Sequence, residues 1–276
     1  MRLATIRTDA GFAAARVDDT DAVEIDAPDV GVLLADPDWR NRAERATGPR
    51  HDLIDLNYAP LIPRPEKIIC VGLNYRNHIL EMGRELPDHP TLFAKYASSL
   101  VGAFDDIVLP RVSTMVDWEA ELAVIIGAPA RHVSVEDAPR AIAGYSVLND
   151  VSVRDYQNRT LQWLQGKTFE SSTPLGPELV TLDEFDDPSS LEMTCEVEGQ
   201  QMQQALTSDL VFGPAALISY MSDIFTLMPG DVIATGTPGG VGHARTPPRY
   251  LQDGEVVVTR IAGVGECRNR CRAEGS

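Results

Sequence analysis

The chain has 276 residues, with 24 lysines and arginines against 41 aspartates and glutamates, and a formal net charge of −17 at pH 7. This charge argues against nucleic acid and anionic membrane surfaces as partners, although a small anionic substrate responds instead to local charge and to any bound metal. No apolar run approaches the ~18 residues of a membrane span, and no apolar signal-peptide segment follows the first five residues.

The four cysteines are too few and too scattered for a disulfide framework in a chain of this length. Two of them lie four residues apart, as in half of a zinc site, but no second pair of cysteines or histidines completes it. We therefore expect reduced thiols and a cytoplasmic protein. The cysteines are Cys70, Cys195, Cys267 and Cys271.

Residues 1–62 are predicted to form a small N-terminal α/β domain, separate from a main domain at 63–276. Short strand-like runs at 3–7, 11–17 and 22–25 are divided by turn residues. Residues 30–46 have a helical pattern that Asp36 and Pro37 interrupt. The proline-rich residues 59–65 are typical of a stiff linker between the two domains.

The main domain begins with an apolar strand at 67–72, and residues 75–82 then fit two helical turns ended by Gly83. His78 and Glu81 would lie on one face of this helix, where Glu81 could orient the imidazole as a general base. The alternative is an exposed helix with an incidental contact between the two. The polar residues 84–90 fit either a mobile lid or a surface loop.

The stretch from Asp117 to Gly127 organises the rest of the chain. After Glu121 it is wholly apolar and β-branched, which predicts a strand buried on both faces. Because side chains alternate along a strand, Glu119 and Glu121 point the same way, with Cα atoms about 6.6 Å apart. A second buried strand at 141–148 runs into Asp150, which could add a third carboxylate.

Carboxylates on a buried strand repel each other and resist desolvation, and a hard divalent cation relieves both costs. Mg²⁺ and Mn²⁺ prefer such oxygen ligands, so the pattern predicts a metal site at Glu119, Glu121 and Asp150. The alternative is the acidic edge of a hairpin with its carboxylates in water.

The remaining elements supply polar groups around this site. Further strands are expected at 91–96 and 107–110, a hairpin at 191–203, a helix from 213 to about 221, and a closing hairpin at 251–261. Residues 151–173 are rich in polar side chains, and Gly166 could let the backbone at Lys167 approach a ligand closely. The glycine-rich loop 235–242 is either a tight turn or a source of N–H and hydroxyl groups for a carboxylate.

Together these stretches resemble the fumarylacetoacetate hydrolase family over about residues 66–271. The resemblance rests on several motifs in the family's order. They are Val71-Gly72-Leu73-Asn74-Tyr75 with His78 and Glu81, Asp117-Trp118-Glu119-Ala120-Glu121-Leu122, Asn149-Asp150-Val151-Ser152-Val153-Arg154-Asp155, Gly166-Lys167-Thr168-Phe169, Pro174-Leu175-Gly176-Pro177 and Gly230-Asp231-Val232-Ile233-Ala234-Thr235-Gly236-Thr237-Pro238.

The resemblance implies an α+β, predominantly β fold: a mixed β-sandwich roll with a small N-terminal α/β domain, usually as a homodimer. It also implies roles for individual residues. These are Mg²⁺ or Mn²⁺ ligands at Glu119, Glu121 and Asp150, a water-activating dyad of His78 and Glu81, a catalytic Lys167 beside the metal, and substrate contacts from Arg154, Gln157, Gly236 and Thr237.

The expected reaction is metal-dependent hydrolysis of the C–C bond of a 3-acylpyruvate, such as fumarylpyruvate or acetylpyruvate, to pyruvate and a carboxylic acid. The resemblance implies that His78, held by Glu81, deprotonates the attacking water while Lys167 adds positive charge near the metal. Two alternatives on the same site are oxaloacetate decarboxylation and isomerisation or hydration of 2-hydroxydienoates. A further alternative is a non-catalytic keto-acid-binding protein.

Overall fold

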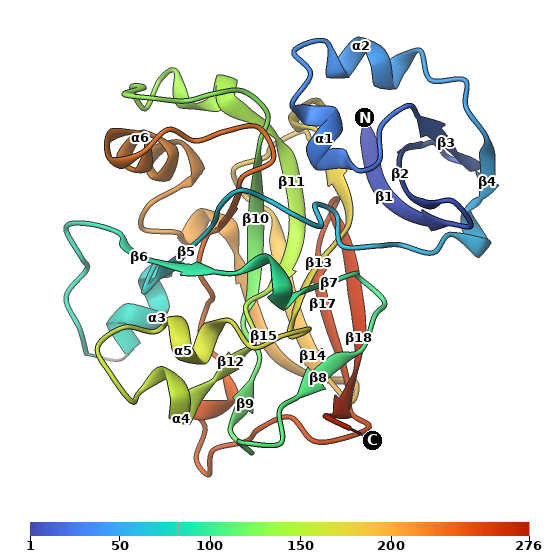
Figure 1. Ribbon diagram of the computed structural model, residues 1–276. Helices are drawn as coiled ribbons and strands as arrows, with labels where there is room; N and C mark the ends of the chain where they lie inside the picture. The colour runs from blue at the N-terminus through green and yellow to red at the C-terminus, as the bar shows by residue number, and fades with distance from the viewer. Residues whose placement is uncertain (82, 276) are drawn as a thin grey trace.

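The computed structural model describes residues 1–81 and 83–275 (Figure 1). Its largest sheet contains strands from both sides of the predicted domain boundary. They are β1 (Arg2–Thr8), β2 (Gly11–Val17), β3 (Asp21–Ile25), β4 (Arg50–Asp52), β5 (Ile68–Gly72), β6 (Thr91–Lys95), β7 (Leu100–Val101), β10 (Ala120–Ile126), β11 (Ile142–Asn149), β13 (Thr173–Val180) and β16 (Val232–Ala234). The spatial order is β4-β3-β2-β1-β13-β11-β10-β16-β5-β6, and β7 pairs with β13.

A second sheet has the order β15-β14-β17-β18-β8. Its strands are β8 (Ile107–Leu109), β14 (Glu192–Val197), β15 (Gln200–Leu206), β17 (Val256–Ile261) and β18 (Gly265–Ala273). A short pair is formed by β9 (Val116–Asp117) and β12 (Ser152–Val153). The helices are α1 (Val30–Leu34), α2 (Trp39–Glu44), α3 (Arg76–Glu81), α4 (Arg154–Gln157), α5 (Leu164–Lys167) and α6 (Pro214–Ile224). The predominantly β, α+β sandwich expected from the sequence is confirmed.

Strand β10 is buried on both faces, as its continuous apolar run predicts. Leu122, Val124 and Ile126 belong to the core cluster that also contains the inward residues of β14, β17 and β18. Ala123 and Ile125 point the other way and pack in a cluster with residues of β1 and α1. This alternation places Glu121 on the face of β10 that is turned away from the second sheet.

The N-terminal strands extend the large sheet, because β1 pairs antiparallel with both β2 and β13. Strands β1–β4 curl beneath α1 and α2 at one end of the molecule, coloured blue in Figure 1. The side chain of Asp29 caps α1 by accepting a hydrogen bond from the Val32 N–H, at 2.9 Å. The boundary between residues 1–62 and 63–276 stays a prediction.

Several strands are not predicted by the sequence, and β13 and β18 are the longest of them. Strand β13 contains Pro174, Gly176 and Pro177, residues that normally interrupt strands, and its pairing with β11 is irregular between Tyr145 and Val147. Strand β18 is the partner of β17, so the closing hairpin lies at residues 256–273 and not at 251–261. The other predicted strands and helices are confirmed within about two residues, apart from β15, which continues to Leu206, and α6, which continues to Ile224.

All four cysteines are buried and unbridged, in agreement with the expectation of reduced thiols. Burial raises the pKa of the Cys271 thiol to about 12, so it carries a proton at neutral pH. Among the helices that the structure describes, none has the length and apolar character needed to cross a membrane.

Candidate active site

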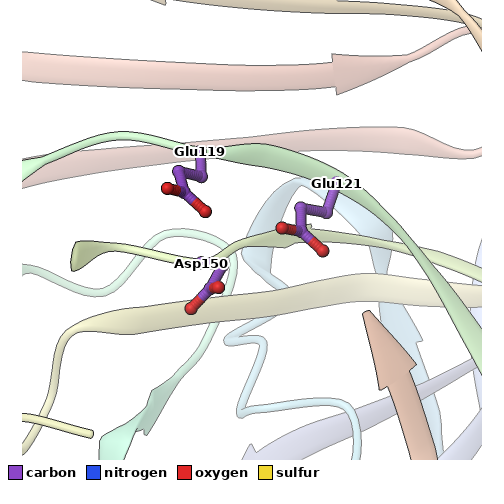
Figure 2. A group of neighbouring side chains, drawn as sticks. All are labelled: Glu119, Glu121 and Asp150. Atoms are coloured by element: carbon purple, nitrogen blue, oxygen red, sulfur yellow. The ribbon is translucent and has the colours of Figure 1, made fainter. Parts of the chain in front are cut away.

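Three carboxylates meet where β10 begins and β11 ends (Figure 2). The antiparallel register sets Ala120 opposite Asn149, so Asp150 follows beside Glu119, and the Asp150 N–H donates to the Glu119 carbonyl at 2.8 Å. Glu121 lies two residues along the chain from Glu119 and faces the same way. One oxygen from each carboxylate lies within 4.8 Å of the others, and all three residues are buried.

Glu121 is the least neutralised of these acids. Burial raises the pKa of Glu121 well above its ordinary value, and the negative charges of Asp150 and Glu119 raise it further. The Gly236 N–H donates to its Oε2 at 2.7 Å and partly opposes this shift. Its other oxygen accepts no hydrogen bond from residues 1–81 or 83–275. Glu121 therefore has one oxygen atom free to bind a cation.

Two buried lysines contact the triad from different strands and helices. Lys167, at the end of α5, places Nζ 2.7 Å from Glu119 Oε2 and 2.7 Å from Asp150 Oδ2. Lys95, at the end of β6, places Nζ 2.7 Å from Asp150 Oδ1. Burial works to raise the pKa of Asp150, but the charges of Lys167 and Lys95 outweigh it and keep the pKa below its ordinary value.

Arg154 completes the charged group from the start of α4. Its Nη1 lies 2.6 Å from Glu119 Oε1, and its Nε donates to Asp117 Oδ2 at 2.8 Å. Asp117 also accepts the backbone N–H groups of Gly242 and His243, at 2.7 and 2.9 Å. Asp117 thereby joins Arg154 to the glycine-rich loop and holds both against the triad.

The charge balance of this group tests whether a divalent cation fits. Four buried carboxylates, at positions 117, 119, 121 and 150, face three buried cationic side chains, at 95, 154 and 167, within the described chain. With all four carboxylates ionised, one negative charge has no cationic side chain to balance it, and Glu121 is the carboxylate that pairs with none of the three. Carboxylate oxygens are the ligands that Mg²⁺ and Mn²⁺ prefer, so Glu119, Glu121 and Asp150 fit such a cation.

A cavity of about 250 Å³ opens onto the triad. Helices α3, α4 and α5 gather on this side of the molecule beside β6 (Figure 1). The cavity wall brings together most of the residues that the sequence singled out: His78, Glu119, Glu121, Arg154, Gln157, Lys167 and Thr237. Apolar side chains such as Val71, Phe93 and Trp163 also line the cavity, together with Arg84 and His243.

His78 lies between this cavity and a second depression of about 510 Å³, and it lines both. Glu81 lines only the outer depression, and no hydrogen bond joins the two side chains within the described residues. Burial lowers the pKa of His78, while the charges of Glu81 and Glu119 act in the opposite direction. His78 is therefore a neutral imidazole at pH 7, able to accept a proton.

The glycine-rich loop contacts both the triad and the cavity. The Gly236 N–H, predicted to bind a substrate carboxylate, is used by Glu121. The Thr237 hydroxyl faces the cavity and accepts a hydrogen bond from Gln203 Nε2 at 2.8 Å, which leaves its own hydrogen for a ligand. Gly166 allows a close approach to the backbone of Gln157 on α4.

Two charged residues at the site were missed by sequence reasoning. Lys95 lies on the strand predicted at 91–96 and Asp117 lies in one of the family motifs, but the sequence predicts no role for either residue. A lysine at the end of an otherwise apolar strand is a usable signal, since a buried lysine requires a negative partner. No local pattern identifies that partner as Asp150, 55 residues away.

The comparisons with known proteins agree with this fold and site. Residues 67–272 match the family model described as "Fumarylacetoacetate (FAA) hydrolase C-terminal". Because that match covers most of the chain, the protein belongs to the fumarylacetoacetate hydrolase family of enzymes. The acidic triad is consistent with the divalent metal that members of this family typically use.

Particular relatives narrow the comparison further. The chain is 43% identical over 232 residues to "Oxaloacetate tautomerase Fahd2a, mitochondrial" from Rattus norvegicus, covering 83% of this chain and 74% of the rat protein. The solved structure of a fumarylacetoacetate hydrolase from Exiguobacterium antarcticum has a TM-score of 0.88 and 32% identity, covering 99% of this chain and 100% of that one. A 5-carboxymethyl-2-hydroxymuconate delta-isomerase from Mycobacterium smegmatis has a TM-score of 0.84 and 33% identity, covering 99% and 100%.

Proposed function

We propose that this protein interconverts the keto and enol forms of oxaloacetate, or of a closely similar 2-oxo acid, with the help of Mg²⁺ or Mn²⁺. The observation that carries the proposal is that Glu119, Glu121 and Lys167 line one small cavity bordered by a neutral His78, with the buried Asp150 beside the two glutamates. The rat and other relatives that are named as oxaloacetate tautomerases support the choice of reaction.

A divalent cation on the triad would supply Lewis-acid stabilisation for negative charge on the 2-oxo oxygen of the substrate. Lys167 is held by two carboxylates, which keep its ammonium group charged at the cavity wall despite burial. This fixed charge stabilises the same developing oxyanion without reorganisation. Arg154 and Gln157 border the same space, where their N–H groups can orient the 1-carboxylate.

His78 is the group that moves the proton in this proposal. From keto to enol, its neutral imidazole accepts a proton from C3 and delivers it to the 2-oxo oxygen. From enol to keto, it accepts the proton of the enol hydroxyl and delivers it to C3. Enolisation needs only this transfer, so it does not depend on a hydrogen bond from Glu81. The cavity volume, about 250 Å³, lies below the ~300–1,000 Å³ of drug-sized sites and suits a four- or five-carbon acid.

Hydrolysis of a 3-acylpyruvate is the second candidate, and one observation favours it. His78 and Glu81 both line the outer depression, where an attacking water could reach His78 and be activated. Decarboxylation of oxaloacetate and isomerisation of 2-hydroxydienoates use the same stabilised oxyanion and remain further alternatives. The small anionic substrate, the homodimer and the cytoplasmic location also stay proposals.

The experiment is a substrate panel on metal-stripped protein, before and after reloading with Mg²⁺ or Mn²⁺. We expect rapid tautomerisation of oxaloacetate in the reloaded protein, loss of at least about 100-fold with chelator, and a similar loss in Glu121→Gln. Cleavage of acetylpyruvate or fumarylpyruvate to pyruvate without tautomerisation would select the hydrolase instead. Binding of keto acids without any turnover would select the non-catalytic alternative.

A control variant separates the two candidate reactions. Glu81→Gln removes a charge that lines only the outer depression. Tautomerisation is expected to change by less than about threefold in this variant, because no hydrogen bond from Glu81 supports His78 within the described residues. If the protein hydrolyses 3-acylpyruvates through the dyad, the rate of hydrolysis falls in Glu81→Gln. That loss would identify water activation as the main role of His78 and Glu81.

A further inference from the structure

Arg84 is a solvent-exposed residue that lines the cavity, and no carboxylate of the described residues pairs with its positive charge. Arg154 and Lys167 line the same cavity, but both form ion pairs with buried acids of the site. The guanidinium of Arg84 forms no ion pair or side-chain hydrogen bond with residues 1–81 or 83–275. Its backbone is anchored to the end of α3, where the Arg84 N–H donates to the Ile79 carbonyl at 3.2 Å.

The unpaired charge changes what the cavity can accept. The inner group has one excess negative charge, so a divalent cation on the triad leaves one excess positive charge, and Arg84 adds a second. A 2-oxo monocarboxylate compensates only one of these charges, whereas a 2-oxo dicarboxylate compensates both. Guanidinium groups bind carboxylates through paired, charge-assisted hydrogen bonds, which gives such a contact geometric as well as electrostatic selectivity.

The glycine-rich loop is the other candidate for holding a second carboxylate, and it is less well equipped. The Gly236 N–H is already bound to Glu121, which leaves the Thr237 hydroxyl as a single neutral donor on the cavity wall. A charged donor forms a bond roughly twice as strong as a neutral one. Arg84 reaches the cavity from the segment after α3, whereas the triad comes from the start of β10 and the end of β11.

We propose that Arg84 binds the second carboxylate of a 2-oxo dicarboxylic acid and thereby selects dicarboxylates over monocarboxylates. The proposal rests on the proposed function, because it assumes that the first carboxylate and the 2-oxo group lie at the triad. It assigns the substrate class that the family resemblance leaves open: a short dianion such as oxaloacetate.

The test compares oxaloacetate with acetylpyruvate, in which a methyl group replaces one carboxylate oxygen while the 2,4-dioxo skeleton stays. In Arg84→Gln we expect kcat/KM for oxaloacetate to fall about 10- to 30-fold, mostly through KM, and that for acetylpyruvate to change less than about twofold. Arg84→Lys keeps the charge and should recover part of the loss. Arg76→Gln removes an exposed arginine on α3 outside the cavity wall and should affect neither substrate.

A binding measurement keeps this proposal separate from the reaction itself. Equilibrium dialysis of both acids against Mg²⁺-loaded protein should show the same selective loss in Arg84→Gln, even if the native protein turns over neither acid. Absence of turnover with a selective binding loss would reject the proposed reaction and support the role of Arg84. Equal losses for both acids, or no loss for either, would overturn the role of Arg84 whatever the reaction.

Discussion

At the scale of single residues, Glu121 combines deep burial with two negative neighbours and one backbone hydrogen bond. Such a carboxylate is stable in the folded protein only if it holds a proton or faces a cation. A proton and a metal therefore compete for the same oxygen atoms. Because of this competition, the free energy of unfolding depends on both pH and the concentration of the metal.

The sign of the pH effect follows from the direction in which folding moves the pKa. Because folding raises the pKa of Glu121, its proton favours the folded state, and this contribution is complete below the unfolded value of about 4.5. The contribution is lost as pH rises through the folded pKa. In chelator, the stability of Glu121→Gln relative to the native protein should therefore increase with pH between the unfolded and folded pKa values, by about 1.4 kcal/mol for each pH unit.

Urea unfolding in chelator from about pH 5 to 8 measures this difference. Glu170→Gln, which removes an exposed glutamate, serves as the control and should show no such trend. Saturating Mg²⁺ should cancel or reverse the advantage of Glu121→Gln, since the cation stabilises only the native carboxylate. A pH-independent difference would mean that Glu121 does not titrate with folding.

At the scale of elements, the contact between α4 and α5 positions three charged or polar side chains of the site. Helix α4 carries Arg154 and Gln157, and α5 carries Lys167. The two short helices approach closely because Gly166 has no side chain. A Cβ at Gly166 would lie 2.3 Å from the Gln157 backbone nitrogen and 2.6 Å from its Cα.

We predict that Gly166→Ala forces α4 and α5 apart and displaces Lys167 from the triad. Overpacking of this kind costs about 1–3 kcal/mol in the free energy of unfolding, and misplacement of about 1 Å lowers kcat by about 100-fold. Gly213→Ala is the control, because nothing lies within 4 Å of a Cβ there and its φ of −71° suits any residue. Urea unfolding and steady-state kinetics measure the two effects. Native kcat in Gly166→Ala would contradict the role of this contact.

Strand β13 shows how far local patterns can mislead about an element. Its prolines and glycine favour a loop in isolation, yet it lies in the middle of the large sheet between β1 and β11. The irregular register with β11 accommodates residues that cannot complete a regular ladder. By contrast, the β14–β15 hairpin was predictable, because Glu198 and Gly199 occupy its two-residue turn with positive φ values.

At the scale of the whole molecule, the N-terminal residues and the main domain share one sheet and one core. Pairing of β1 with β13 continues the hydrogen-bond ladder across the predicted boundary at residue 62. Leu3 and Leu33 pack in the same buried cluster as Ile125, Leu148 and Leu179 of the central strands. Separating the two parts would expose apolar surface and the edge of β13.

We predict that residues 63–276 alone do not reach a soluble, cooperative folded state. The unpaired edge of β13 and the uncovered cluster favour aggregation over folding. Size-exclusion chromatography and thermal unfolding of this fragment test the expectation, and co-expression with residues 1–62 provides the control. A monodisperse fragment with a sharp transition would instead support two autonomous domains.

The residues of the candidate metal site and most elements followed from sequence alone, because alternation, burial runs and turn residues act over a few neighbours. Glu119 and Glu121 share a face by strand geometry, and Asp150 ends the next strand along the chain. Only the tertiary structure decided which charges face them. Lys95 pairs with Asp150 and Asp117 pairs with Arg154, in both cases across segments far apart in the chain. Arg84 likewise meets the site only in the cavity that the folded sandwich forms. Such pairings depend on the packing of the whole sandwich, which no local pattern encodes.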